Sequence, residues 1–319
     1  MPELPEVESI RSSLEKHILS AEVVDGRVLH SDVLVERDEF PEEVDCPSYK
    51  TDRQSDVPSR KLKRLQGRSV RGVSRRGKYL LIHLSDQQIV VGHMRMTGQL
   101  VCAPGEWFEK PEIWPPHTHV ILKLRLPDGG VIALLFIDVR RFGRLEIMTR
   151  QTFHNLETGI AKLGPEPLSS NFNFEWIKNK AERHQRLSVK SFLLDQTVIA
   201  GLGNIYADEI LFASGVHPLR RVSSVRNWEW EILIKATKMI IKKAIEARGT
   251  SFRDYIDAEG KQGEFQLQLQ VYGRGGKDCL RCGEELQKTK VGGRTSVYCN
   301  FCQPRQGRSR QDWSERFCK

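Results

Sequence analysis

The sequence predicts an α+β protein in which a helix and a β-rich half precede a helical half and a small cysteine module. Short segments rich in Val, Ile and Leu, separated by turn residues, fill positions 21–145. Longer segments with helical apolar spacing follow the turn sequence Gly-Pro-Glu-Pro at 164–167. Two CxxC pairs lie near the end of the chain. These observations indicate a β-sandwich or barrel first, then helices and a metal-binding module.

The first element is expected to be a helix, because Pro5 suits a first turn and Glu6 and Glu8 complement the helix dipole there. One apolar stripe follows at helical spacing: Val7, Ile10, Leu14 and Ile18. Strands are expected at 70–73, 79–84, 88–92, 119–124 and 131–137. Further helices are expected at 174–182, 188–194, 204–213, 224–246 and 252–256.

Two segments interrupt the strand pattern. Residues 30–60 are polar and acidic in the middle, and residues 103–116 are rich in Pro and Trp. Both are expected to be surface loops, and the first is a candidate for disorder.

Composition narrows the class of protein. A chain of 319 residues is long enough for two domains, and no segment has the 18 or more consecutive apolar residues of a membrane helix. The acidic start MPELPEVES does not resemble a secretory signal, so a cytoplasmic protein is expected. Lysine and arginine exceed aspartate and glutamate by 50 − 41 = 9, and positions 271–319 hold 11 basic and 5 acidic side chains. A basic excess concentrated near the end of the chain favours binding of a nucleic acid there.

The cysteine module carries the most specific signal. Cys279 and Cys282 form one CxxC pair, and Cys299 and Cys302 form another, with sixteen residues between the pairs. Four thiolates at this spacing predict a closed, tetrahedral zinc site of structural type. The alternative, a redox dithiol, needs a βαβ context that the sequence lacks.

The N-terminus carries a second signal. If Met1 is removed, Pro2 exposes a secondary amine, and α-amino groups titrate near pH 7.7–8.0, so part of the population is nucleophilic at neutral pH. Glu3 and Glu6 lie within one turn and are candidates for proton transfer. The alternative is that these acids only compensate a helix dipole.

Glycine-containing and basic turns add two weaker signals. The run GLGNIY at 201–206 is either a phosphate-approach site at a helix start or an ordinary helix–helix turn. The turns RRGKY, HMRMTG and DVRRFG place basic and apolar side chains together. Each is explained by a solvated turn, but apolar wedges beside arginine are also what unstacking of a duplex requires, and chemistry on a base requires its extrusion.

Together these residues resemble formamidopyrimidine-DNA glycosylase, the bacterial-type repair family that acts on 8-oxoguanine and ring-opened purines. The resemblance covers almost the whole chain in order: MPELPEVE, RRGKYL, HxxMTG, RRFG, LGPEPL, LLDQTVIAGLGNIYADEILF, and VYGR before the cysteines. It implies an N-terminal helix with a β-sandwich domain (1–150), a hinge (151–168), a helix–two-turn–helix domain (169–265), a zinc finger (266–303) and a basic tail (304–319).

The resemblance also implies residue roles. Pro2 attacks C1′ as a Schiff-base nucleophile, Glu3 and Glu6 handle protons, and β- and δ-elimination follow. Lys78 contacts DNA at the lesion and takes part in proton transfer, and Arg294 serves the phosphates and the last elimination. Residues implied to fill the void or to contact phosphates are His117, Arg140, Gln185, Arg186, Asn204, Met96 and Phe142. Residues 249–265 match the loop that folds over the flipped base. The expected cofactor is one structural zinc ion. The expected partner is damaged double-stranded DNA, and no association with a membrane is expected. The protein is expected to be a monomer.

Some positions depart from the family pattern. HMRM places Arg95 where some relatives carry glycine, the run at 184–186 is less basic than in many relatives, and the tail to Lys319 is longer than usual. The alternatives are an endonuclease VIII-like enzyme for oxidised pyrimidines, a non-catalytic zinc-finger DNA-binding protein, and an RNA-associated zinc-ribbon protein. Leu4 and the RRFG motif favour the purine enzyme over the first alternative.

Overall fold

The fold is of the α+β class, as predicted. The computed structural model describes residues 2–37, 60–157, 159–252, 255–307 and 309–312. The chain forms two compact units. The first unit contains Met1–Pro2, Glu6–Ala161 and Ser251–Gly263, and the second contains Glu3–Pro5, Lys162–Thr250 and Glu264–Lys319. The domain boundaries expected from the sequence stay a prediction.

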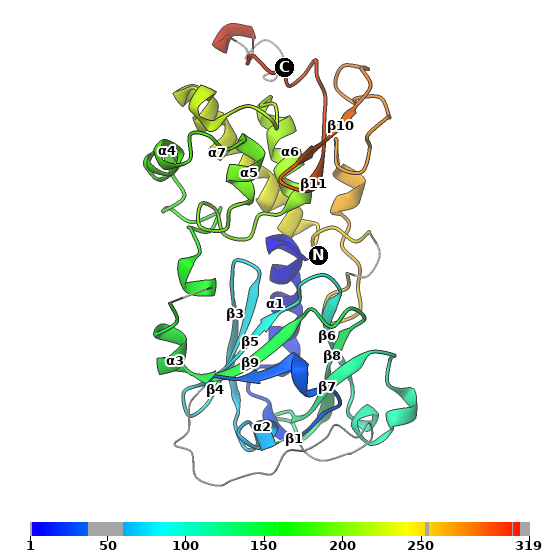
Figure 1. The fold of residues 1–319 in the computed structure, drawn as a ribbon. Coiled ribbons are helices and arrows are strands. Elements are labelled where there is room, and N and C mark those ends of the chain that lie inside the picture. Colours follow the sequence, from blue (N-terminus) through cyan, green and yellow to red (C-terminus); the bar gives the residue numbers. More distant parts are fainter. Residues whose placement is uncertain (1, 38–59, 158, 253–254, 308, 313–319) are drawn as a thin grey trace. The chain divides into compact units, whose positions relative to one another are not determined.

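The first unit is built from two β-sheets (Figure 1). One sheet has the strand order β2 (Leu34–Glu36), β9 (Arg144–Thr149), β5 (Gln88–His93), β4 (Tyr79–Leu84) and β3 (Val70–Arg76). The other has the order β1 (Glu22–Val28), β7 (Thr118–Arg125), β8 (Val131–Asp138) and β6 (Gly98–Pro104). Neighbouring strands pair antiparallel, except that β2 runs parallel to β9.

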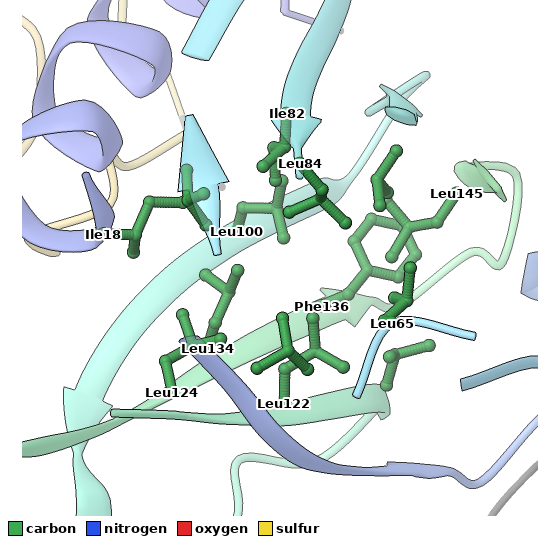
Figure 2. Close-up of a pocket in the computed structure, with 14 residues that line it drawn as sticks. Ile18, Leu65, Ile82, Leu84, Leu100, Leu122, Leu124, Leu134, Phe136 and Leu145 are labelled. Atoms are coloured by element: carbon green, nitrogen blue, oxygen red, sulfur yellow. The ribbon is translucent and has the colours of Figure 1, made fainter. Parts of the chain in front are cut away.

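One apolar core joins the two sheets to helix α1 (Leu4–Ile18). The predicted stripe on α1 is buried in this core, together with Leu134 and Phe136 of β8 and Leu145 of β9. Figure 2 shows a small cavity inside it, which leucine, isoleucine, valine and phenylalanine side chains from both sheets line. Because no polar group lines this space, it belongs to the packing of the core.

The two segments expected as loops are partly ordered elements. In the first, Ser31–Val33 form a 3-10 turn and Leu34–Glu36 form β2, because Val33 and Leu34 are buried; residues 38–59 lie outside the described part. In the second, 3-10 turns at Gly105–Glu109 and Pro111–Ile113 bury Phe108 against β7 and β8. Most described residues of these segments are exposed or half-buried, as expected of surface segments, but each segment also contains short ordered elements that bury apolar side chains. Short helices α2 (Arg60–Lys63) and α3 (Arg150–His154) complete the unit.

The second unit is helical and ends in a short β-hairpin. Its helices are α4 (Phe174–Arg183), α5 (Val189–Leu194), α6 (Asn204–Ser214) and α7 (Asn227–Glu246). The side chains of Asn173 and Ser188 cap α4 and α5 by accepting backbone N–H groups, which satisfies donors that a helix start leaves free. The hairpin is formed by β10 (Gln287–Val291) and β11 (Arg294–Tyr298).

The helix expected at 252–256 is not found among the described residues of that segment, Phe252, Tyr255 and Ile256. Tyr255 instead packs against the core of the first unit, and its hydroxyl donates to the carbonyl of Glu6 at 3.1 Å. No helix in the described ranges has the length and apolar character that a membrane crossing requires.

Truncation of a core side chain tests the position of this core. We expect Leu134→Ala to lower the free energy of unfolding by about 2–5 kcal/mol, because it enlarges a cavity that the neighbouring strands cannot fill. Leu19→Ala, at a side chain that is 48% exposed, is the control and should change it by less than about 0.5 kcal/mol. Denaturant unfolding measures both, and equal effects would contradict the assignment of Leu134 to the core.

Candidate functional site

The carboxylate of Glu3 is buried at the start of helix α6. Glu3 is 3% exposed, and its oxygens accept the backbone N–H groups of Gly203 at 2.7 Å, Ile205 at 3.0 Å and Tyr206 at 3.5 Å. A helix start offers free N–H groups and a positive dipole end, which suits a carboxylate. The residue after Pro2 is thereby held at a helix start that lies 200 residues further along the chain.

The GLGN run makes this contact possible. A Cβ atom on Gly203 would lie 2.4 Å from Cδ and Oε1 of Glu3, so only glycine leaves room for the carboxylate. Gly201 has φ +88°, a value that favours glycine, and a Cβ atom there would lie 2.6 Å from Leu4. The Gly201 carbonyl accepts the Leu4 N–H at 3.0 Å. The N–H groups of this turn thus bind a carboxylate of the chain itself.

Other N-terminal residues belong to the first unit. Pro2 and Glu6 are buried, and Glu6 is 1% exposed. Glu8 accepts from Arg75 at 2.9 Å and from Arg11 at 2.7 Å, so this acid neutralises an arginine of β3. Of the acids in the first helical turns, Glu3 and Glu6 are almost fully buried, whereas Glu8 forms ordinary ion pairs.

Lys78 lies in the turn between β3 and β4 and is only 7% exposed. Its charge contributes to the electrostatic environment of His93. Burial, the Arg95 charge and the Lys78 charge together lower the pKa of His93 to about 4. The Nδ1 atom of His93 accepts the Arg95 N–H at 3.0 Å, so the neutral ring carries its proton on Nε2. The sequence reasoning did not assign His93 to the site. His93 is the first residue of the HxxMTG motif, but its proximity to Lys78 follows from the pairing of β4 with β5, which the motif does not reveal.

Two exposed loops of the first unit are organised by one buried carboxylate. Asp138 is fully buried and accepts the hydroxyl of Thr97, the N–H of Arg140 at 3.2 Å and the N–H of Gly143 at 2.6 Å. Its own N–H donates to the carbonyl of His117 at 3.0 Å. The turns 95–97 and 139–142, which we call the wedge loops, are therefore fixed to the same side chain.

The wedge loops present cations and apolar groups together. Met96 is 40% exposed and Phe142 is 52% exposed, although both are large apolar residues. The guanidinium of Arg140 lies 4.9 Å from the centre of the Phe142 ring, within cation–π range. His117, the remaining residue of this unit predicted to contact phosphates, is also exposed. The structure thus brings Met96, Arg140, Phe142 and His117 together around Asp138.

The remaining predicted contacts lie in the second unit. Asn204 opens α6, and its Nδ2 atom donates to the Thr295 carbonyl at 2.9 Å. Arg294 is exposed at the start of β11, directly after a two-glycine hairpin tip. Gln185 and Arg186 are exposed between α4 and α5, and no hydrogen bond joins either of them to Asn204 or Arg294 in the described structure. Asn204 therefore lies next to the residue that follows Arg294.

The four cysteines form a compact metal-binding group. Their sulfur atoms all lie within 4.8 Å of one another, with Cys279 and Cys302 3.9 Å apart and Cys282 and Cys299 3.5 Å apart. Four ligands about 2.3 Å from a tetrahedral ion are separated by about 3.8 Å, so the thiolate set fits such an ion. Phe212, Leu286 and Val297 pack around the cysteines, which leaves a closed site of structural type.

Three family models cover most of the chain. The formamidopyrimidine-DNA glycosylase N-terminal domain matches residues 1–145, the H2TH domain of the same enzyme matches 163–255, and a zinc finger found in FPG and IleRS matches 276–305. The predicted two-turn helical domain and cysteine finger are thereby confirmed.

Relatives match over their full length. A formamidopyrimidine-DNA glycosylase of Desulforamulus reducens is 44% identical over 306 residues, which cover 95% of this chain and 99% of the relative. The enzyme of Vibrio atlanticus is 36% identical, over 95% of this chain and 100% of the relative.

Solved structures of the same family resemble this chain in fold. A complex of a Lactococcus lactis FPG mutant with Fapy-dG-containing DNA has a TM-score of 0.78 and 31% identity, covering 95% of this chain and 100% of that one. A complex of the Lactococcus lactis protein with DNA containing an abasic site has a TM-score of 0.77 and 31% identity, covering 94% and 99%. The buried Glu3 carboxylate, the wedge loops and the four-cysteine group therefore lie in a chain that belongs to the formamidopyrimidine-DNA glycosylase family of base excision repair.

Proposed function

We propose that this protein removes oxidised purines, 8-oxoguanine and formamidopyrimidines, from double-stranded DNA and then cleaves the strand at the same site. The observation that carries the proposal is the Glu3 carboxylate, buried at the start of α6 directly after Pro2. Relatives solved with Fapy-dG-containing and abasic DNA support the substrate class. The preference for purines over oxidised pyrimidines rests on Leu4 and the RRFG motif.

The proposed reaction begins at the N-terminal amine. After removal of Met1, the Pro2 nitrogen attacks C1′ of the damaged nucleotide and the glycosidic bond breaks, so that the base leaves with a proton. The C1′–O4′ bond of the sugar then breaks as O4′ takes up a proton, and the open-chain iminium ion that results makes the C2′ proton acidic. Its loss expels the 3′ phosphate, and a second elimination expels the 5′ phosphate and leaves a one-nucleotide gap. Hydrolysis of the iminium releases the amine.

Proton transfers are assigned to two acids close to the amine in the chain and to one lysine of the first unit. Glu3 gives and takes the protons of base loss and ring opening, and Glu6 supports it. Lys78 provides a nearly buried ammonium for proton transfer at the lesion, beside His93. Arg294 binds the phosphates and favours the last elimination, since a guanidinium stabilises a phosphate that leaves.

DNA is proposed to meet exposed groups of both units. Met96 and Phe142 fill the space that the extruded nucleotide vacates, and Arg140 faces the orphaned base. His117, Asn204, Gln185 and Arg186 contact phosphates and add the sequence-independent part of the affinity. The cysteines are proposed to hold one zinc ion, which fixes the finger and takes no part in the chemistry. A monomeric, cytoplasmic protein stays a prediction.

Borohydride trapping tests the nucleophile. With enzyme whose mass confirms a Pro2 terminus, we expect a covalent complex on a duplex with 8-oxoguanine opposite cytosine, mapped to Pro2, because hydride reduces the iminium. Pro2→Gly should abolish strand cleavage and keep DNA binding. A thymine-glycol duplex that is cut faster than the 8-oxoguanine duplex would favour the pyrimidine enzyme. Binding without any adduct on either duplex would favour a DNA-binding protein without catalysis.

Gly203→Ala tests the position of Glu3. The added methyl would meet the end of a flexible side chain, so we expect the fold to survive while the carboxylate moves and base removal falls by about 10²–10³-fold, a loss typical of a misplaced acid–base group. Glu3→Gln should give a loss of base removal at least as large. Gly72→Ala is the control, because nothing lies within 4 Å of a Cβ atom there. Single-turnover excision of 8-oxoguanine measures the effect, and normal excision by Gly203→Ala would contradict the assignment.

Removal of the metal tests the finger. We expect a chelator to release one zinc ion per chain and to weaken DNA binding, because the four cysteines no longer hold the hairpin once the ion that joins them is removed. Cys282→Ser should lose zinc and affinity together. Metal release is followed with a colorimetric reagent and binding by fluorescence anisotropy. Full DNA affinity of metal-free protein would contradict the prediction.

A further inference from the structure

A buried ion pair lies between helices α5 and α6. The Lys190 ammonium is 2.7 Å from the Asp208 carboxylate, and the two side chains are 0% and 1% exposed. Taking two charges out of water is costly, and such a pair is by itself weak evidence for stability. The proposed reaction uses neither residue, so their other contacts show what the pair does.

Both members of the pair bind strand β11. The Lys190 ammonium donates to the Thr295 carbonyl at 3.1 Å, where the Asn204 amide also donates. The Asp208 carboxylate accepts the Ser296 hydroxyl at 2.7 Å and the Val297 N–H at 3.0 Å. Three consecutive residues of β11 are therefore fixed by one buried pair, and the residue before them is Arg294.

The hairpin needs this support. A two-stranded ribbon is marginally stable alone, and β10 and β11 have five residues each. Cys299 follows directly after β11, so the cysteine group holds one end of the hairpin. At the other end, Gly292 and Gly293 have φ +53° and +75°, which gives a tip whose residues are exposed. Figure 1 shows the hairpin beside α6. Hydrogen bonds from Lys190 of α5 and Asp208 of α6 hold β11 close to this tip.

The Lys190 ammonium interacts electrostatically with both groups that the proposed reaction uses in this unit, Glu3 and Arg294. Burial lowers the pKa of the Lys190 ammonium, Asp208 and Glu3 raise it, and Arg294 lowers it further. The ammonium therefore senses the Glu3 carboxylate and the Arg294 guanidinium, and Asp208 offsets the repulsion that Arg294 would otherwise meet.

We propose that Lys190 and Asp208 are positioning residues that hold the backbone of β11 so that the Arg294 guanidinium meets DNA phosphates. This inference rests on the proposed function, because it assumes that the exposed face of the finger binds DNA. Neither residue touches the substrate. Their effect is transmitted through the carbonyl of Thr295 and the groups of Ser296 and Val297.

A double-mutant cycle on DNA binding tests the inference. The probe is a duplex with a tetrahydrofuran abasic analogue, which has no base to excise, and the protein is the full chain loaded with zinc. We expect Arg294→Ala to weaken binding by about tenfold, as for a lost charged hydrogen bond. Asp208→Asn should weaken it by a similar factor. In the Asp208→Asn protein, the additional change Arg294→Ala should weaken DNA binding by less than about twofold, because the guanidinium is already misplaced.

Two further variants separate positioning from folding. Lys190→Met combined with Asp208→Leu removes both charges, leaves no lone buried ion, and serves if Asp208→Asn does not fold. Glu229→Gln breaks another buried pair of this unit, with Arg220, that makes no hydrogen bond to β11 in the described structure, so Arg294→Ala should keep its tenfold effect there. Zinc content should stay at the level of the parent protein in all of these variants.

Two results would overturn the inference: equal losses from Arg294→Ala with and without Asp208, or no loss from Arg294→Ala in the parent protein. Because the readout is binding to an uncleavable duplex, it decides the matter even if the parent protein excises nothing. Failure of the proposed function is detected separately, as absence of cleavage of the 8-oxoguanine duplex. Where cleavage occurs, Asp208→Asn should share the accumulation of β-elimination product expected for Arg294→Ala.

Discussion

The contact between the Glu3 carboxylate and the start of helix α6 constrains the rest of the molecule. A carboxyl group that is 3% exposed is tolerated only when its oxygens are hydrogen bonded, and three backbone N–H groups serve here. The contact requires glycine at 203, and the positive φ of Gly201 lets the turn approach Leu4. It also assigns Glu3–Pro5 to the second unit while the following residues of α1 pack in the first. The environment of the Glu3 carboxylate therefore depends on a turn far along the sequence.

Buried carboxylates elsewhere in this basic protein have a similar role. Asp138 fixes the wedge loops, and Asp208 fixes strand β11. Glu209, the neighbour of Asp208 on α6, accepts the N–H groups of Gln270, Val271 and Tyr272 at 2.8–2.9 Å and so holds the segment that leads into the finger. Acids inside the protein orient the backbone, while the basic residues proposed to meet DNA are mostly exposed on loops held in this way. The net charge of +9 therefore understates how positive the exposed surface is, since several of the acids that lower the net charge are buried.

The sequence was most informative where a local pattern determines the structure. The apolar stripe of α1, the strands β4 and β8 and the CxxC pairs follow from spacing alone, and all are present. It was least informative where partners lie far apart in the chain. Glu3 and Gly203 are separated by 200 residues, and no periodicity relates them. Phe108 lies in a segment whose Pro and Trp content suggested a loop. Its ring is nevertheless buried against apolar side chains of β7 and β8, which would otherwise be exposed to water. The segment around Tyr255 has helical composition, but contacts with α1 and the sandwich core override that propensity.

The same electrostatics bear on the choice between an enzyme and a simple DNA-binding protein. DNA is a dense polyanion, so a carboxylate close to it lowers affinity, and burying that carboxylate is costly for the fold as well. A protein selected only to bind DNA would gain by replacing Glu3 with a neutral residue. Here the backbone of α6 and two glycines are arranged around this acid, and the residue before it is a proline whose amine is nucleophilic once Met1 is removed. Proton transfer, the role proposed for Glu3, accounts for an acid held at this cost directly after Pro2, whereas binding of DNA alone does not require it.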